Sequence, residues 1–127
     1  MLLLYIALGS ALGGVLRYLL GTALQRPGQY PVGTLLVNVT GSFVLGLVLR
    51  LATETTLVSP QARAFLAVGL CGGFTTFSTF SWEVLSLAEH GAWLRAGGYA
   101  LLSVALSLAA CAAGMALARQ LAEAALP

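Results

Sequence analysis

Residues 69–83 read Gly-Leu-Cys-Gly-Gly-Phe-Thr-Thr-Phe-Ser-Thr-Phe-Ser-Trp-Glu, a poor sequence for a continuous helix although apolar residues flank it on both sides. Glycine costs backbone entropy in a helix, and the short side chains of Thr and Ser compete for backbone hydrogen bonds. In a membrane, an interrupted helix leaves N–H and C=O groups free, which is tolerated only where protein buries them or where they line a cavity. We therefore predict a break within a membrane span and a candidate ion site at that break. Free carbonyls could hold a cation there, and hydroxyl and N–H groups could meet an anion.

The composition around this stretch is that of a membrane protein. Of the 127 residues, 59% are hydrophobic and only 8% are charged, and the mean hydropathy is +0.94. Soluble domains carry about 25% charged residues. The chain has six Arg and four Glu, with no Lys and no Asp, which is too little charge to cover a surface that faces water. The net charge of +2 is also too small, and the Arg too dispersed, for a nucleic-acid surface.

Four segments are long enough to cross a hydrocarbon core, which takes about 20 apolar residues per helix. They lie near residues 2–24, 33–52, 62–88 and 94–118. The connections are short, so consecutive helices are expected to run antiparallel. The sequence predicts an all-α membrane protein, with a single domain over residues 1–127, four transmembrane helices and an interrupted third helix.

The arginines bear on orientation, because cytoplasmic loops of membrane proteins carry an excess of basic residues. The six divide equally, with Arg50, Arg63 and Arg119 on the side of the two termini and Arg17, Arg26 and Arg95 on the opposite side. A tie favours neither orientation. It indicates that the protein inserts in both orientations and pairs as an antiparallel, dual-topology homodimer. The alternative is that numbers of arginines this small carry no information about orientation.

Polar side chains inside the spans follow two stripes with a spacing of four residues. Such side chains are costly in lipid and usually face protein or a water-filled path. The stripes are Thr34, Asn38 and Ser42 in the second span, and Tyr99, Ser103 and Ser107 in the fourth. Either stripe could instead bond its own helix or hold helices together. Two stripes, one of them carrying an amide, favour a track of hydroxyl and amide groups.

Phe77 and Phe80 share a face if the helix resumes after the break. The positive edge of a Phe ring can face an anion without the trapping strength of a full charge. Ordinary core packing is the alternative for both rings.

For the remaining notable residues the sequence predicts structural roles. Gly9 and Gly13 in the first span, and Gly69 and Gly73 in the third, have the spacing that lets membrane helices approach closely. Cys71 and Cys111 lie in apolar stretches and are expected to be packing residues. The single histidine, His90, lies in a loop without a nucleophile, acid and base at recognisable spacing, so we predict no enzymatic activity.

Three motifs, taken together and in order, closely resemble the Fluc (CrcB) fluoride-channel family. They are GGVLRY at residues 13–18, GTLLVNVTGSF at 33–43 and GLCGGFTTFSTFS at 69–81. The resemblance implies a fluoride-selective channel of the prokaryotic inner or plasma membrane, surrounded by lipid, that exports fluoride passively and relieves its toxicity. It also implies an antiparallel homodimer with two pores, each built from both subunits, and a structural Na⁺ at the dimer centre.

The resemblance assigns roles to individual residues. Arg17 resembles a vestibule arginine, Glu83 resembles a carboxylate near one end of the pore, and the backbone carbonyls of Gly72 and Thr75 resemble the sodium ligands. The implied fluoride pathway comprises Thr34, Asn38, Ser42, Phe77, Thr79, Phe80, Tyr99, Ser103 and Ser107.

Two other functions remain open at this stage. A small proton-coupled drug or cation exporter can also have four spans, but it needs an ionisable carboxylate in the membrane, and Glu83 is the only candidate. A non-conducting accessory subunit held by its Gly contacts is the third possibility.

Overall fold

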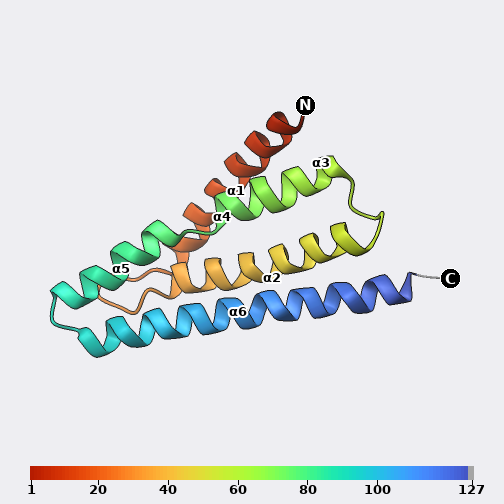
Figure 1. Cartoon of the computed structure of the whole chain (residues 1–127). Coiled ribbons are helices and arrows are strands. Elements are labelled where there is room, and N and C mark those ends of the chain that lie inside the picture. The colour runs from red at the N-terminus through yellow and green to blue at the C-terminus, as the bar shows by residue number, and fades with distance from the viewer. Residues whose placement is uncertain (126–127) are drawn as a thin grey trace.

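The computed structural model describes residues 1–125 as helices joined by short connections (Figure 1). Along the chain these are α1 (Leu2–Leu24), α2 (Val32–Glu54), α3 (Pro60–Arg63), η1 (Ala64–Cys71), α4 (Gly72–Phe74), α5 (Phe77–Glu89) and α6 (Trp93–Ala124). The segments α3, η1 and α4 follow one another without a gap, and α5 continues them after two residues.

Four stretches of helix are long and apolar enough to cross a membrane, as predicted: Leu2–Leu24, Val32–Glu54, Pro60–Glu89 and Trp93–Ala124. The predicted ends of the first span agree with the structure, whereas the other three spans are longer than predicted. The fourth runs past residue 118 to Ala124, where Arg119 Nε lies 3.1 Å from Glu123 Oε1 one turn later. Such pairs and a high alanine content keep a chain helical after its apolar run has ended.

Local sequence explains where the third span begins and ends. Ser59 caps its start by accepting a hydrogen bond of 3.1 Å from the Ala62 N–H, and Pro60 occupies the first helical position, where its missing N–H costs nothing. At the far end, Gly91 has φ +79°, the left-handed conformation that glycine adopts at helix ends. The Gly91 and Ala92 N–H groups bond the carbonyls of Ala88 and Leu87, which closes the helix.

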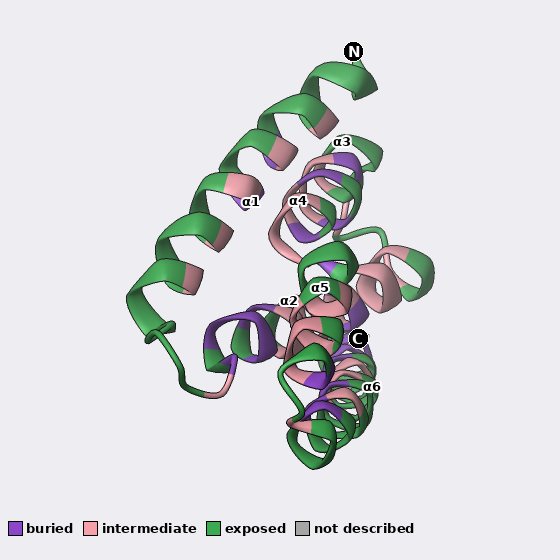
Figure 2. Cartoon of the chain, turned by 90° about the vertical axis from the view of Figure 1, so that its left-hand side faces the viewer, coloured by how far each residue is buried: buried purple, intermediate pink, exposed green. Residues whose placement is uncertain are grey.

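The helices pack in two groups. α2 lies along α6, and α1 crosses η1 and α4 at an angle to the other helices (Figure 1). Most of α1 is exposed, and its buried residues are Gly9 and Gly13 (Figure 2). A Cβ on Gly69 would lie 2.9 Å from the Gly9 Cα, and one on Gly13 would lie 2.8 Å from the Phe74 backbone nitrogen. The predicted glycine contacts therefore exist, and they join the first span to the first half of the third.

Residues 64–71 form a π-helix, which the sequence did not predict. A π-helix is wider than an α-helix and often marks a functional region. Here it carries the contact between Gly69 and Gly9 of α1, and α4 separates it from the break. Cys71 is buried in this segment, and Cys111 is half-buried; both are free thiols, as expected of packing residues.

Candidate functional site

The third span breaks at Thr75 and Thr76. Both residues are extended, with φ/ψ of −78°/156° and −150°/113°. Gly72 and Gly73, which were expected to weaken the helix, are themselves helical, so the break lies just after the glycine pair. The break lies within the stretch of residues 69–83 for which the sequence predicted an interruption, and the structure places it at Thr75 and Thr76.

Asn38 on α2 satisfies the broken backbone. Its Oδ1 accepts a hydrogen bond of 2.7 Å from the Thr76 N–H, and its Nδ2 donates one of 3.1 Å to the Thr76 carbonyl. The side-chain amide thus supplies the acceptor that the Thr76 N–H lacks at the break, and it adds a hydrogen bond to the Thr76 carbonyl. One of the two Nδ2 hydrogens remains for another acceptor.

Among the carbonyls next to the break, those of Gly72 and Thr75 have lost the N–H groups that would bind them in a continuous helix. The partner of the Gly72 carbonyl would be the Thr76 N–H, which bonds Asn38 instead. The partner of the Thr75 carbonyl would be the Thr79 N–H, which bonds Thr76 Oγ1 at 3.2 Å. Arg17 Nη1 lies 3.4 Å from the Thr75 carbonyl oxygen. Gly72 is exposed, so its carbonyl lies near the surface of the chain.

Helix α5 starts at the break and presents two aromatic rings. Thr76 is its N-cap. The rings of Phe77 and Phe80 have centroids 5.5 Å apart and an interplanar angle of 46°, which confirms that they share one face. Phe77 is 79% exposed, whereas Phe80 is half-buried and lies 5.4 Å from the Tyr99 ring.

One turn further along α5, Glu83 joins three helices. Thr34 of α2 donates a hydrogen bond of 2.7 Å to Glu83 Oε1, and the Tyr99 hydroxyl of α6 donates one of 2.7 Å to Oε2. Tyr99 is fully buried and Thr34 is buried. Each carboxylate oxygen therefore has a hydroxyl donor, an arrangement that suits a fixed anion.

Two cavities flank the break. The first, here called the Arg17 cavity, measures about 380 Å³ and contains Arg17, Thr34, Thr76, Thr79 and Glu83 in its lining. The second, the Phe77 cavity, measures about 320 Å³ and is lined by neutral side chains that include Asn38, Ser42, Phe77, Phe80, Ser103 and Ser107. Thr76 lines both cavities, so the break separates them.

The predicted site residues divide between Glu83 and the Phe77 cavity according to their position in each polar stripe. The first residue of each polar stripe, Thr34 or Tyr99, bonds Glu83. The later residues of both stripes line the Phe77 cavity together with the two Phe rings. Ser103, which is 5% exposed, is one of these lining residues, and its Oγ is buried without a hydrogen-bond partner among residues 1–125.

Sequence reasoning missed Thr76 and Tyr30. Thr76 is 6% exposed and connects Asn38, Thr79 and both cavities. Its position three residues before Thr79, at the start of a helix, is the signal that could have identified it as a cap. Tyr30, in the connection between α1 and α2, places its ring 5.5 Å from that of Tyr99, and no motif indicated this contact.

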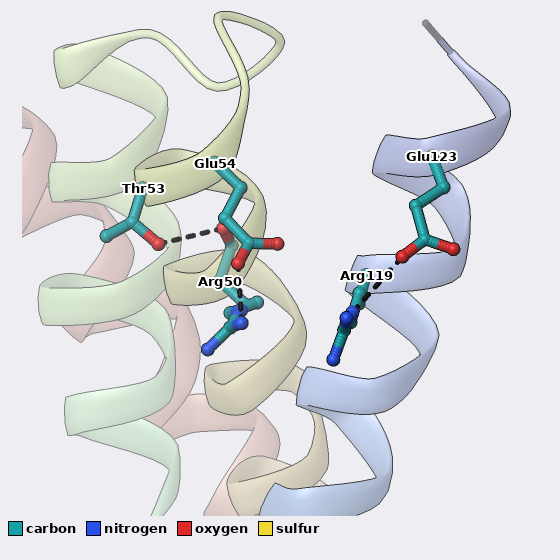
Figure 3. Close-up of polar contacts among 5 residues, drawn as sticks. All are labelled: Arg50, Thr53, Glu54, Arg119 and Glu123. Carbon is teal, nitrogen blue, oxygen red and sulfur yellow. Dashed lines mark hydrogen bonds and ion pairs between the residues drawn. The ribbon is translucent and has the colours of Figure 1, made fainter.

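Four of the eight other Arg and Glu residues lie at the ends of α2 and α6 that are far from the break. Arg50 pairs with Glu54, and Arg119 pairs with Glu123 (Figure 3). A hollow of about 680 Å³ lies beside them, lined in part by Thr53, Glu54, Arg119 and Glu123. It is larger than the cavities at the break, but its charges are paired with each other and it contains none of the predicted site residues. We therefore place the site at the break.

Comparison with known proteins agrees with this geometry. Residues 4–115 match the family model described as CrcB-like protein, Camphor Resistance (CrcB). A Fluoride-specific ion channel FluC of Rhizobium meliloti (strain 1021) is 47% identical over 119 residues, which cover 92% of this chain and 95% of the relative. Proteins with the same name from Roseiflexus sp. (strain RS-1) and Geobacter sulfurreducens are each 48% identical, over 91% and 94% of this chain and 95% and 98% of the relatives.

Proposed function

The chain belongs to the CrcB-like family, and from that premise we propose that it is a fluoride-selective anion channel that lets fluoride leave the cell passively and so relieves fluoride toxicity. The observation that carries the proposal is the near-full-length similarity to proteins named Fluoride-specific ion channel FluC, at 47% and 48% identity. The protein is a channel rather than an enzyme. It is a multi-pass membrane protein, and we place it in the prokaryotic inner or plasma membrane.

The Phe77 cavity has the chemistry that fluoride conduction requires. Fluoride is small, strongly hydrated and a strong hydrogen-bond acceptor, so hydroxyl and amide donors can replace its water. Such donors are the spare Nδ2 hydrogen of Asn38 and the hydroxyls of Ser42, Ser103 and Ser107, all from residues that line the cavity. The Ser103 hydroxyl has no partner within the described part of the chain. No charged side chain lines this cavity among the residues described. Neutral donors and ring edges bind an anion well enough for entry and weakly enough for exit.

The Arg17 cavity supplies the charge that a vestibule needs. Arg17 raises the local concentration of anions at its mouth. Glu83 lines the same cavity, but the hydroxyls of Thr34 and Tyr99 occupy both of its oxygens. These bonds tie the carboxylate to α2 and α6, and the similarity to proteins named Fluoride-specific ion channel FluC favours a channel over a proton-coupled exporter.

The proposal includes an antiparallel homodimer. Phe77 is 79% exposed beside its cavity, and Gly72 is exposed at the break, so both are open to a second copy. The equal division of arginines is compatible with insertion in both orientations. In such a dimer, each pathway is completed by the partner, and lipid covers the outer faces.

We also propose a structural Na⁺ at the centre of the dimer. The carbonyls of Gly72 and Thr75 fit this role because both have lost their helical N–H donors. Oxygen ligands suit a hard cation, and a bound cation would supply positive charge that ties the two broken helices together. Arg17 also donates to the Thr75 carbonyl, so that oxygen would be shared between the Arg17 guanidinium and the Na⁺.

Ion efflux from proteoliposomes tests the function. Purified protein should release fluoride passively and very little chloride. Equal release of both anions would contradict selectivity. Proton-coupled cation transport would identify an exporter, and no transport at all would identify an accessory subunit.

Orientation has its own test. A cysteine-reactive or proteolytic probe applied to intact cells should reach a C-terminal tag in about half of the molecules if both orientations are populated. A tag that is reached in all molecules or in none would contradict dual topology.

A further inference from the structure

The connection between α1 and α2 is a defined structure rather than a loose loop. Residues 26–29 form a turn in which the Gln29 N–H bonds the Arg26 carbonyl at 3.1 Å. Pro27 occupies the second position and Gly28, with φ +73°, the third, as in a type II turn. Immediately afterwards, the Val32 N–H bonds the Tyr30 carbonyl at 2.7 Å around Pro31.

That second turn fixes Tyr30 at the start of α2. Pro31 has φ −75° and ψ 64°, the values of an inverse γ-turn, and its ring restricts φ to this region. Pro31 is also buried. Tyr30 is therefore presented by a backbone with little conformational freedom.

The Tyr30 ring packs edge-to-face against the Tyr99 ring. Their centroids lie 5.5 Å apart with an interplanar angle of 85°, the edge-to-face arrangement that aromatic pairs favour. Phe80 also packs against Tyr99, at 5.4 Å and 53°. Tyr99 thus has rings from two different elements as neighbours, and this restricts its tilt.

We propose that Tyr30 is a positioning residue for ion conduction: its ring holds Tyr99 in the orientation that keeps the Tyr99 hydroxyl on Glu83. This inference rests on the proposed channel function. Glu83 has hydroxyl donors from Thr34 and Tyr99. If Tyr99 tilts away, Oε2 loses its donor, and Thr34 alone holds the Glu83 carboxylate, which can then turn further into the Arg17 cavity and repel an anion there.

The contact depends on the ring of Tyr30 rather than on its hydroxyl. We therefore expect Tyr30→Phe to retain fluoride efflux. Tyr30→Leu removes the ring, and we expect efflux from proteoliposomes to fall roughly threefold to tenfold, the scale of one aromatic pair. Tyr5→Leu, at the opposite end of α1, is the matched control and should leave efflux unchanged.

A second readout follows Tyr99 directly. In an NMR spectrum of protein with ¹³C-labelled tyrosine, the chemical shift of the Tyr99 Cζ reports the hydrogen bond from its hydroxyl to Glu83. The chain has four tyrosines, and the signal that disappears in Tyr99→Phe is that of Tyr99. The signal should shift in Tyr30→Leu and stay in place in Tyr30→Phe. Tyr30→Met serves the same purpose if the Leu variant does not yield a monodisperse protein.

The two readouts separate this inference from the proposed function. Absence of fluoride efflux from the unaltered protein would overturn the channel function, while the Tyr99 signal would still test the positioning contact. Lower efflux with an unmoved Tyr99 signal would overturn the inference, because Tyr30 would then act elsewhere. Unchanged efflux in Tyr30→Leu would overturn it as well, whether or not the signal moves.

Discussion

The two halves of the third span are held to their neighbours by different kinds of contact. Residues 60–74 pack against α1 through glycine, backbone against backbone, at Gly9, Gly13, Gly69 and Gly73. Residues 77–89 are held to α2 and α6 by side-chain hydrogen bonds that converge on Glu83. The first half should therefore be sensitive to added volume, and the second to altered hydrogen bonding. This difference separates the part of the span that packs against α1 from the part in which we propose the ion path.

The largest effect is expected where volume is added to the glycine contact. In Gly13→Val, the new side chain would overlap the Leu70 carbonyl oxygen and crowd the Phe74 nitrogen, and neither backbone atom can move away alone. Overpacking usually costs about 1–3 kcal/mol, and a clash with backbone lies at the upper end. We expect little or no monodisperse protein by size-exclusion chromatography. Gly14→Val is the matched control, because a Cβ on Gly14 meets nothing within 4 Å; equal yields of the two variants would contradict this account.

A smaller effect on folding, accompanied by a loss of transport, is expected at Asn38. Asn38→Asp keeps the acceptor for the Thr76 N–H but replaces the donor to the Thr76 carbonyl with a negatively charged oxygen. That charge also enters the Phe77 cavity, so fluoride efflux should fall by about tenfold or more, corresponding to at least 1.4 kcal/mol. Thr40→Val is the control, since Thr40 bonds the carbonyls of its own helix. Unchanged efflux in Asn38→Asp would return Asn38 to a packing role.

The smallest effect on the fold is expected at Gly72. A Cβ there meets nothing within 4 Å in the chain, so Gly72→Ala should leave the folded subunit intact. If the Gly72 carbonyl lies at the dimer centre, the new methyl group should weaken dimerisation, measured as a higher dissociation constant in lipid or detergent. A dimer as stable as the unaltered one would argue against a dimer contact at this glycine.

Sequence predicted the interrupted span but not the residue at which it breaks. Helix propensity is a weak guide, and tertiary contacts override it. A Cβ on Gly73 would lie 2.5 Å from the Ser10 carbonyl oxygen, so Gly73 packs closely on α1 while it stays helical. The break occurs where Asn38 can replace the lost backbone bonds, and a partner 38 residues away in the chain is not visible in local sequence.

The two polar stripes were predicted, whereas their division between two sites was not. Residues four apart on a helix are displaced by about 40° around its axis, so a stripe of three turns by about 80°. Thr34 can therefore face Glu83 while Ser42 faces the Phe77 cavity. Tyr30 lies beside Tyr99 because the connection between α1 and α2 packs against α6. The spacing of residues in the sequence does not predict such a contact.

The most direct test of the account concerns the rings of Phe77 and Phe80, because an electrostatic role for their edges distinguishes an ion path from core packing. In Phe77→Ile with Phe80→Ile, both positions keep a large apolar side chain but lose the ring. Fluoride efflux should be measured from proteoliposomes containing this double variant and, for comparison, a Met replacement with its polarisable sulfur. We expect a steep loss of efflux in the Ile double variant while it remains a monodisperse dimer, and a partial recovery with Met. Full fluoride efflux through the Phe77→Ile, Phe80→Ile protein would contradict the proposed mechanism.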